Sequence, residues 1–434
     1  MTIITTSILA LLIIFLGASL WIWLALYSVG ITGLFLFRDL PIDKLLPQVT
    51  YKIVTTPELM ALTLFVLMAE SLFRTRMSES LFKGLSPWAA LMPGRLLHVT
   101  VLGCTLFAAV SGSSAATTAV VGRITTSELL RRGYDRDLVI GSLAGAGTFG
   151  LLIPPSGILI IYGVLAEESI LKLFIAGVIP GLILGCSFMV FLGLRAIINP
   201  AVVSRDVEPA VSWGQRFHSL LDIAPVLLLI FFVMGSMYGG FATPSEAAAV
   251  GCLGAVFVSA AQKTLNFKNL ARAFLGATRT MSMIGLIIAG AVFLSVALGF
   301  LGVPDAIARG IAKLNLSPFM LILLLVVFYA ALGMVLEGNS AIIMTLPITL
   351  PLVLAAGFDK VWFGIFLVLV VEMAQVTPPV GFNLFVIQGL TGDKISRIAK
   401  AAIPFFLIMV GMCILFVLYP EIVLFLPEYI QFRG

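Results

Sequence analysis

The chain has 434 residues, of which 60% are apolar and only 11% are charged, whereas an ordinary soluble domain has about 25% charged residues. This composition excludes a water-soluble fold and predicts an all-α polytopic membrane protein. The formal net charge of +5 does not indicate a nucleic-acid partner, because the Lys and Arg residues lie in short segments between apolar runs, where they orient a membrane protein.

The first predicted element is an apolar run over residues 3–37, and residues 1–37 carry no charged side chain. A span needs about 20 such residues, and the run lacks the basic start of a signal peptide. We therefore interpret it as one long mature segment. Further continuous runs predict spans near residues 56–73, 173–194, 220–238, 246–262, 280–301 and 402–426.

Four other apolar regions are each interrupted by a polar or proline motif. The breaks are Ser111-Gly112-Ser113-Ser114 in 94–130, Ile153-Pro154-Pro155 in 138–165, Glu337-Gly338-Asn339-Ser340 in 318–356 and Thr377-Pro378-Pro379 in 362–390. Gly112 and Gly338 are 226 residues apart, and Pro154 and Pro378 are 224 residues apart. Two motifs in the same order at nearly one offset predict a duplicated unit. An odd number of predicted crossings separates the copies, so the repeats are predicted to be inverted.

Charged residues between the runs predict the orientation. Segments 74–95, 123–136, 195–216, 263–279 and 394–400 are basic, so we expect these loops to face the cytoplasm. The pattern Thr243-Pro244-Ser245-Glu246 is typical of a capping box with proline in the first turn. It predicts the start of the span at 246–262.

The interrupted segments are the candidate functional site. Pro154 and Pro155 remove two donors and expose the carbonyls just upstream. With the hydroxyls of Ser113, Ser114 or Thr148, these oxygens would form a hard-oxygen cage suited to an alkali cation. Each half-helix after a break directs the positive end of its dipole at the site, which suits an anionic substrate. Either motif alone is explained equally well by helix packing or a kink, whereas the inverted duplication favours a transport site.

Two acids in the interrupted segments leave proton coupling open as an alternative. Glu337 precedes the second polar break and Glu372 lies inside an apolar run, and an intramembrane carboxylate is functional by default. Only one repeat contains each acid, whereas the hydroxyl, amide and proline features are duplicated. We therefore favour sodium and interpret Glu337 as a structural acceptor for the N–H groups of its hairpin.

The chain resembles the large membrane subunit (DctM-like) of the tripartite ATP-independent periplasmic (TRAP) transporters over nearly its whole length. The motifs that carry the resemblance are SGSSAATTA from Ser111, GTFGLLIPPS from Gly147, GFATPSEAAAV from Gly240 and TPPVGFN from Thr377. The resemblance implies a multi-pass permease of the bacterial inner membrane. It also implies a DctQ-like small membrane subunit, a periplasmic substrate-binding protein, and sodium-coupled uptake of organic acids by an elevator mechanism with two re-entrant hairpins and two broken helices.

The resemblance also implies two sodium sites as the coupling sites, with no organic cofactor. The first would comprise Gly112, Ser113, Ser114, Gly150, Ile153 and Pro155, to which the predicted cage adds Thr148. The second would comprise Gly338, Asn339, Ser340, Thr377 and Pro379, with Ala374 at the position of Gly150. The side chains expected to contact the anionic substrate are Ser113, Ser114, Asn339, Ser340 and Asn383.

The predicted organisation has scaffold helices at 1–93 and 195–301, and a transport domain built from the repeats at 94–194 and 302–434. The long first segment, with Trp21 and Trp23, is a candidate surface for the small subunit or an interfacial belt among membrane lipids. One alternative is a stand-alone carboxylate or ion transporter with inverted repeats, coupled to sodium or protons. An intramembrane enzyme is disfavoured, because the chain has only two histidines and no HExxH, GxSxG or Walker A motif.

Overall fold

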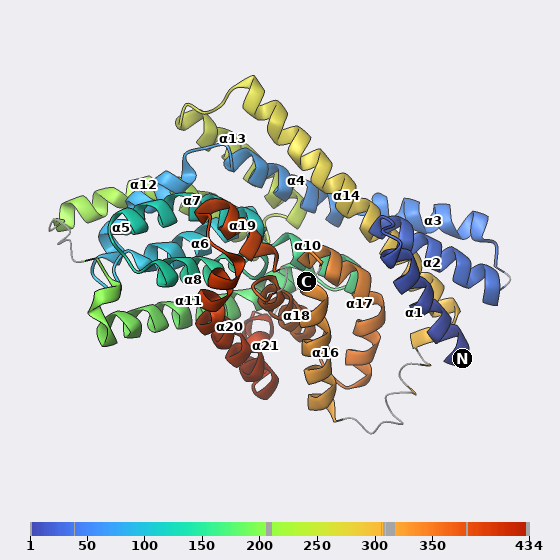
Figure 1. Ribbon diagram of the computed structural model, residues 1–434. Coiled ribbons are helices and arrows are strands. Elements are labelled where there is room, and N and C mark those ends of the chain that lie inside the picture. Colours follow the sequence, from blue (N-terminus) through green and yellow to red (C-terminus); the bar gives the residue numbers. More distant parts are fainter. Residues whose placement is uncertain are drawn as a thin grey trace.

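The computed structural model covers the whole chain and describes residues 2–38, 40–204, 211–304, 306, 309, 317–334, 336–378 and 381–430. Every regular element within these ranges is a helix, as Figure 1 shows. Six of the described helices are long and apolar enough to cross a membrane, or eight if each of two bent pairs is one span. The prediction of an all-α polytopic membrane protein is confirmed.

The two predicted repeats form the centre of the molecule. The first repeat contains α6 (Leu97–Ser111), α7 (Ser114–Arg131), α8 (Arg136–Gly147), α9 (Phe149–Leu152), α10 (Gly157–Ala166) and α11 (Ile170–Ile198). The second contains α16 (Pro318–Gly333), α17 (Gly338–Ala355), α18 (Lys360–Gln375), α19 (Phe382–Thr391), α20 (Ile395–Leu418) and α21 (Glu421–Tyr429).

The repeats exchange partners in a reciprocal way. Helix α10 packs on α17 of the other repeat, and α19 packs on α7. Helix α11 likewise packs on α18, and α20 packs on α8. Each half-helix therefore covers the hairpin of the opposite copy, which is the arrangement expected of two copies related by a pseudo-two-fold axis.

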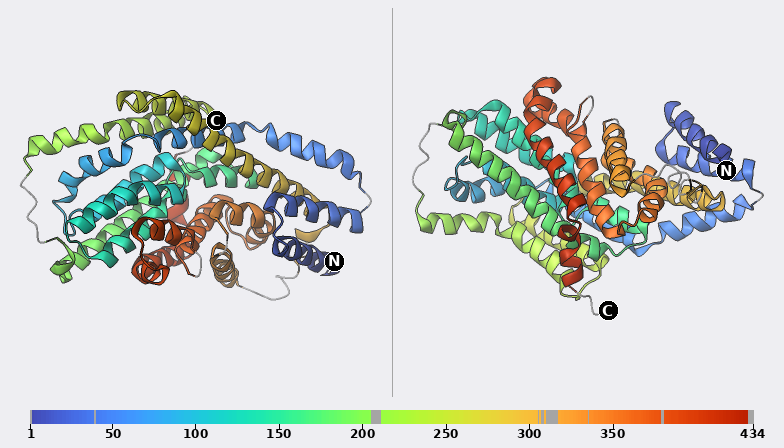
Figure 2. Two further views of the ribbon diagram at one scale, coloured as in Figure 1. Left: turned by 45° about the horizontal axis from the view of Figure 1, so that its top comes forward. Right: turned by 90° about the horizontal axis from the view of Figure 1, so that it is seen from below.

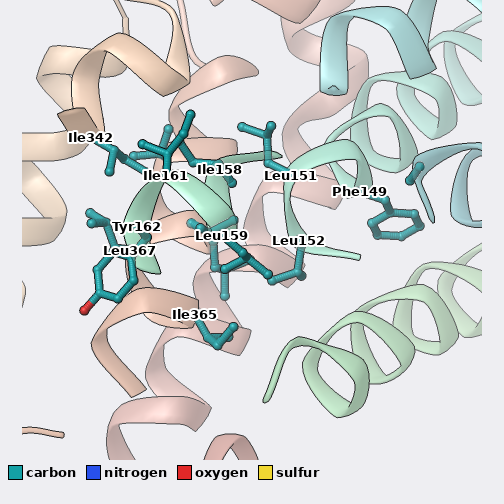
Figure 3. Packing of buried hydrophobic residues seen from close by; sticks show 14 of the residues in the cluster. Phe149, Leu151, Leu152, Ile158, Leu159, Ile161, Tyr162, Ile342, Ile365 and Leu367 are labelled. Atoms are coloured by element: carbon teal, nitrogen blue, oxygen red, sulfur yellow. The ribbon is translucent and has the colours of Figure 1, made fainter. Parts of the chain in front are cut away.

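The core lies around α8 and α18. All residues from Leu138 to Gly147 in α8 and from Val361 to Gln375 in α18 are buried, as expected for helices that are apolar or small on every side. Figure 3 shows Leu159 of α10 near Ile365 of α18 in this cluster. The middle of each broken segment is thus held by packing on all sides.

The remaining helices flank this centre. They are α1 (Thr2–Gly17), α2 (Ile22–Phe37), α3 (Ile42–Val54), α4 (Pro57–Leu72), α5 (Met77–Ala89), α12 (Trp213–Tyr238), α13 (Pro244–Ala261) and α14 (Phe267–Phe300), with a short 3-10 turn η1 (Pro200–Val202). Helix α4 packs on α13, α5 packs on α12, and the long α14 packs on both α2 and α4. Figure 2 shows that this layer lies along one side of the repeats and extends past them towards the N-terminus.

Several predicted boundaries are wrong. Segments 74–95 and 123–136 were expected to be loops, but α5 occupies most of the first and α7 continues to Arg131 in the second. The run at 3–37 is two helices, because α1 ends at Gly17 and Ser19 adopts a left-handed conformation with φ of 58°; apolarity persists through a turn that small residues allow. The segment 263–279 was predicted as a loop, but α14 begins at Phe267 after the Asn266 side chain accepts from the Asn269 N–H at 2.8 Å. Basic residues are good helix formers, so charge alone does not mark a loop.

Candidate ion and substrate site

The first hairpin turns within two residues. Helix α6 ends at Ser111, Gly112 takes the left-handed conformation with φ of 57°, and Ser113 caps α7 by accepting from the Ala116 N–H at 3.4 Å. Glycine after a helix and serine before the next are the residues that such a turn favours. The sequence Ser-Gly-Ser-Ser therefore builds a tight tip between the two helices.

The first break follows α9. Helices α8 and α9 form one bent span with α10, at an angle of 42°. Ile153 is extended, with φ of −84° and ψ of 124°, and the Ser156 hydroxyl donates to the Leu151 carbonyl at 2.5 Å. The prolines at 154 and 155 bring no N–H to this turn, so several carbonyls at the break have no helical donor.

The hairpin tip lies directly on the break. A Cβ atom built at Gly150 would overlap the backbone of Ser113 and Ser114, and one built at Gly112 would lie 3.5 Å from the Pro155 carbonyl oxygen. Only glycine at 150 permits this approach. Gly112, Ser113, Ser114, Gly150 and Pro155, all predicted members of one site, are therefore brought together.

Two other predicted members of the first site direct their side chains elsewhere. The Thr148 hydroxyl donates to the Gly145 carbonyl at 2.6 Å and lies 3.7 Å from the Met409 sulfur in α20. The Ile153 side chain faces α11, where its Cγ1 lies 3.0 Å from a Cβ built at Gly181. Ile153 therefore offers the site its backbone, and Thr148 faces the interior of the core.

The second hairpin is capped by an acid. The Glu337 carboxylate accepts from the Asn339 side-chain amide at 2.7 Å and from the Ser340 N–H at 3.3 Å. The prediction that Glu337 accepts hydrogen bonds from its own hairpin is confirmed. These bonds hold Asn339, and Ser340 is buried.

The caps give the repeats a single offset. Ser113 and Glu337 occupy the same capping position and are 224 residues apart, which equals the spacing of Pro154 and Pro378. The alignment of Gly112 with Gly338 at an offset of 226 is therefore wrong by two residues, because Gly112 precedes the cap of its helix whereas Gly338 follows it. With the corrected offset, Thr148 of the first repeat corresponds to Glu372 of the second.

The second tip lies on the end of α18. A Cβ built at Gly338 would lie 2.8 Å from the Gln375 side-chain nitrogen and 3.2 Å from Leu151 of the first repeat. Ala374 faces α16 instead, because a Cβ atom added to Gly333 of α16 would lie 2.5 Å from the Ala374 Cβ. The two tips therefore approach a common region at the Leu151 side chain.

The remaining predicted residues surround the second break. The Thr377 hydroxyl donates to the Met373 carbonyl at 2.9 Å. Asn383 is fully buried and neither polar atom of its amide has a hydrogen-bond partner, so it is not exposed to a substrate in this conformation. Pro379 lies outside the described residues.

Glu372 is a site residue that the predicted sets omitted. It is 1% exposed, and its Oε1 accepts from the Ser114 hydroxyl. The Leu151 backbone lies nearby, while Oε2 has no partner. Its position inside an apolar run was the signal that could have placed it in the site.

The arrangement fits a hard cation such as sodium. Backbone carbonyls gather at the break, glycine allows the tip to approach, and an orphaned carboxylate oxygen lies among the same groups. Oxygen ligands of this kind suit alkali cations, whereas sulfur and imidazole suit transition metals. The residues that would hold the ion are those of the first tip and first break.

A cavity of about 690 Å³ separates the flanking helices from the second hairpin. Gln48, Lys52 and Glu58 line it from the α3 and α4 side, Ser295 from α14, and Pro347 from α17. Helix α17 also packs on α14, so the gap is confined to the part of the interface that these residues line. Such a crevice is compatible with movement between the two bodies.

A family model for the DctM component of the tripartite ATP-independent periplasmic transporters matches residues 7–422. The chain is 35% identical over 340 residues to the C4-dicarboxylate TRAP transporter large permease protein DctM of Pseudomonas aeruginosa, covering 78% of each chain. It is 29% identical over 391 residues to the isethionate TRAP transporter permease protein DctMQ of Oleidesulfovibrio alaskensis, covering 89% of this chain and 60% of that protein. The crystal structure of the Alcanivorax borkumensis YdaH transporter shares the fold, with a TM-score of 0.65 at 14% identity over 92% of this chain and 97% of that one.

Proposed function

The chain belongs to the DctM family of TRAP transporters, and from that premise we propose that it is the permease of a sodium-coupled system that takes up a small organic acid. It is a polytopic membrane transporter subunit and not an enzyme. The observation that carries the sodium proposal is the docking of the first hairpin tip on the first break, where Gly150 lies against Ser113 and Ser114.

Sodium coupling accounts for the chemistry of that contact. Backbone carbonyls and hydroxyls provide the oxygen ligands, and the tip can move away to release the ion. Two sodium ions entering with one monovalent anion would carry one net positive charge inward, which gains about 2.3 kcal/mol per 100 mV of membrane potential. The membrane potential would then drive accumulation without ATP.

An elevator movement is the proposed route across the membrane. We assign residues 94–194 and 302–434 to the moving transport domain and residues 1–93 and 195–301 to the scaffold. The cavity between α3, α14 and α17 supports this division, because a tightly packed interface would resist sliding.

The proposed partners are a DctQ-like small membrane subunit and a periplasmic binding protein in the bacterial inner membrane. The isethionate relative, a permease protein named DctMQ, supports the association with a small subunit. The binding protein would select the organic acid and deliver it to the periplasmic side of the transport domain. The candidate substrate contacts remain the tip residues Ser113, Ser114, Asn339 and Ser340.

The second candidate function is a stand-alone transporter with inverted repeats, coupled to protons instead of sodium. Its support is the buried Glu372, because an intramembrane carboxylate can relay a proton.

Reconstituted vesicles separate the two candidates. Uptake of the acid bound by the cognate binding protein should require an inward sodium gradient, the small subunit and the binding protein together. Full uptake by this chain alone would support the stand-alone transporter. Uptake that persists without sodium but collapses with the proton gradient would refute sodium coupling.

A further inference from the structure

Glu372 connects segments that are far apart in the sequence. It belongs to α18 in the second repeat, yet its hydrogen-bond donor, the Ser114 hydroxyl, belongs to the first repeat, as does the nearby Leu151 backbone. Ser114 begins the helix after the first tip, and Leu151 lies in the first break. The carboxylate therefore joins the two halves of the first cation site.

The charge of the site gives this contact a second role. The predicted ligands at Gly112, Ser113, Gly150, Ile153 and Pro155 are carbonyl or hydroxyl oxygens, which carry no net charge. A cation in a buried cage of neutral oxygens lacks a counter-charge, and a buried carboxylate without a cation is equally costly. Glu372 Oε2 is buried and has no partner, so cation and carboxylate would each relieve the cost of burying the other.

Glu372 has no acidic counterpart at the equivalent position of the first repeat. Position 148 of the first repeat holds threonine where the second repeat holds Glu372. The second hairpin has its own acid, Glu337, which its own tip already engages through Asn339 and Ser340. Each tip thus has one carboxylate beside it, the buried Glu372 at the first and the half-buried Glu337 at the second.

We propose that Glu372 is the positioning and charge-balancing residue of the first cation site, supplied by the opposite repeat. It holds the tip through Ser114 beside the break at Leu151, and its charge stabilises the bound cation. This inference rests on the proposed sodium coupling and adds a residue that neither the tip motif nor the proline motif contains.

Sodium binding measured on the purified, detergent-solubilised protein tests the inference without transport. The readout is the rise in melting temperature with sodium at constant ionic strength, with choline as the replacing ion. Glu372→Gln keeps the size and an acceptor oxygen but removes the charge. It should raise the sodium concentration for half-maximal stabilisation by at least about tenfold, equivalent to about 1.4 kcal/mol, with the sodium-free melting temperature unchanged or higher.

A matched control is Glu70→Gln. Glu70 lies in the flanking helix α4, outside both repeats, and its carboxylate pairs with Arg74 at 2.8 Å. Its sodium titration should equal that of the wild type. Glu372→Asp retains the charge but withdraws it by one methylene from Ser114 and Leu151, and should give a smaller rise than Glu372→Gln.

Three results would overturn the inference. In the first, sodium stabilises the wild type and Glu372→Gln needs the same sodium concentration for half-maximal stabilisation. Glu372 then plays no part in the site, while sodium coupling still holds. If Glu372→Gln does not fold, an unchanged titration in Glu372→Asp has the same meaning. A wild-type protein that shows no difference between sodium and choline refutes sodium coupling itself, and the inference fails with it.

Discussion

Replacing Gly150 with alanine is the sharpest test of the contact between the first tip and the first break. The added methyl group would overlap the backbone of Ser113 and Ser114, and backbone atoms cannot turn aside as a flexible side chain can. Overpacking of this kind costs about 1–3 kcal/mol. Since the cost applies only when the tip is docked, apparent sodium affinity should fall by roughly 5- to 150-fold.

Helix propensity works in the opposite direction but does not cancel this effect. Alanine stabilises a helix interior by about 1 kcal/mol relative to glycine, and Gly150 lies within α9. That gain is present whether the tip is docked or not, so it raises stability without favouring docking. Gly150→Ala should therefore melt at an equal or higher temperature without sodium while needing more sodium.

The assay is sodium-titrated uptake in vesicles, together with sodium-dependent melting of the purified protein. Gly185→Ala in α11 is the matched control, because the atoms nearest to its added Cβ are 3.9 Å away. Its sodium dependence should equal that of the wild type. A Gly150→Ala protein that folds and shows wild-type sodium dependence would refute the placement of the tip on the break.

The other predictions concern the cap, the break, an ion pair and a helix start. Ser113→Ala should raise the sodium concentration needed for uptake but reduce maximal uptake less than Pro155→Ala does. Pro155→Ala lets the helix re-form, which withdraws the carbonyls from the site. Equal losses of maximal uptake in the two variants would contradict this ranking. Arg136→Glu should lower the melting temperature, because it breaks the ion pair in which Arg136 Nη2 lies 3.0 Å from Asp393 Oδ2. Adding Asp393→Arg should restore part of the lost melting temperature in a double-mutant cycle. Thr243→Ala should destabilise the protein by about 1 kcal/mol, because the cap accepted from the Glu246 N–H is lost, and a changed sodium titration in that variant would contradict a purely structural role.

Sequence reasoning predicted the features that repeat along the chain. Apolar runs predicted the long apolar helices but not α3 and α5, which lie outside every run. The duplicated breaks predicted which helices are interrupted. The capping box at Thr243 was also predicted correctly, since both of its hydrogen bonds are present. These signals are local, because caps, prolines and periodicity act within a few residues.

Contacts between distant segments could not be predicted in the same way. Ser114 and Glu372 are 258 residues apart, and neither composition nor periodicity relates them. The offset of 226 for the tips was wrong because glycine and serine recur in both motifs, whereas capping geometry identifies Ser113 and Glu337 as equivalent. The division of the first apolar run at Ser19 was missed because hydropathy does not change at the turn.

Equilibrium binding of radioactive sodium to the purified protein tests the central claim most directly, because it requires no substrate, partner or gradient. The wild-type protein should bind sodium saturably in the presence of excess choline or potassium. Gly150→Ala should bind it much more weakly, and Gly185→Ala should match the wild type. Saturable binding that is identical in all three folded proteins, or no saturable binding in any of them, would contradict a sodium site at the first hairpin and break.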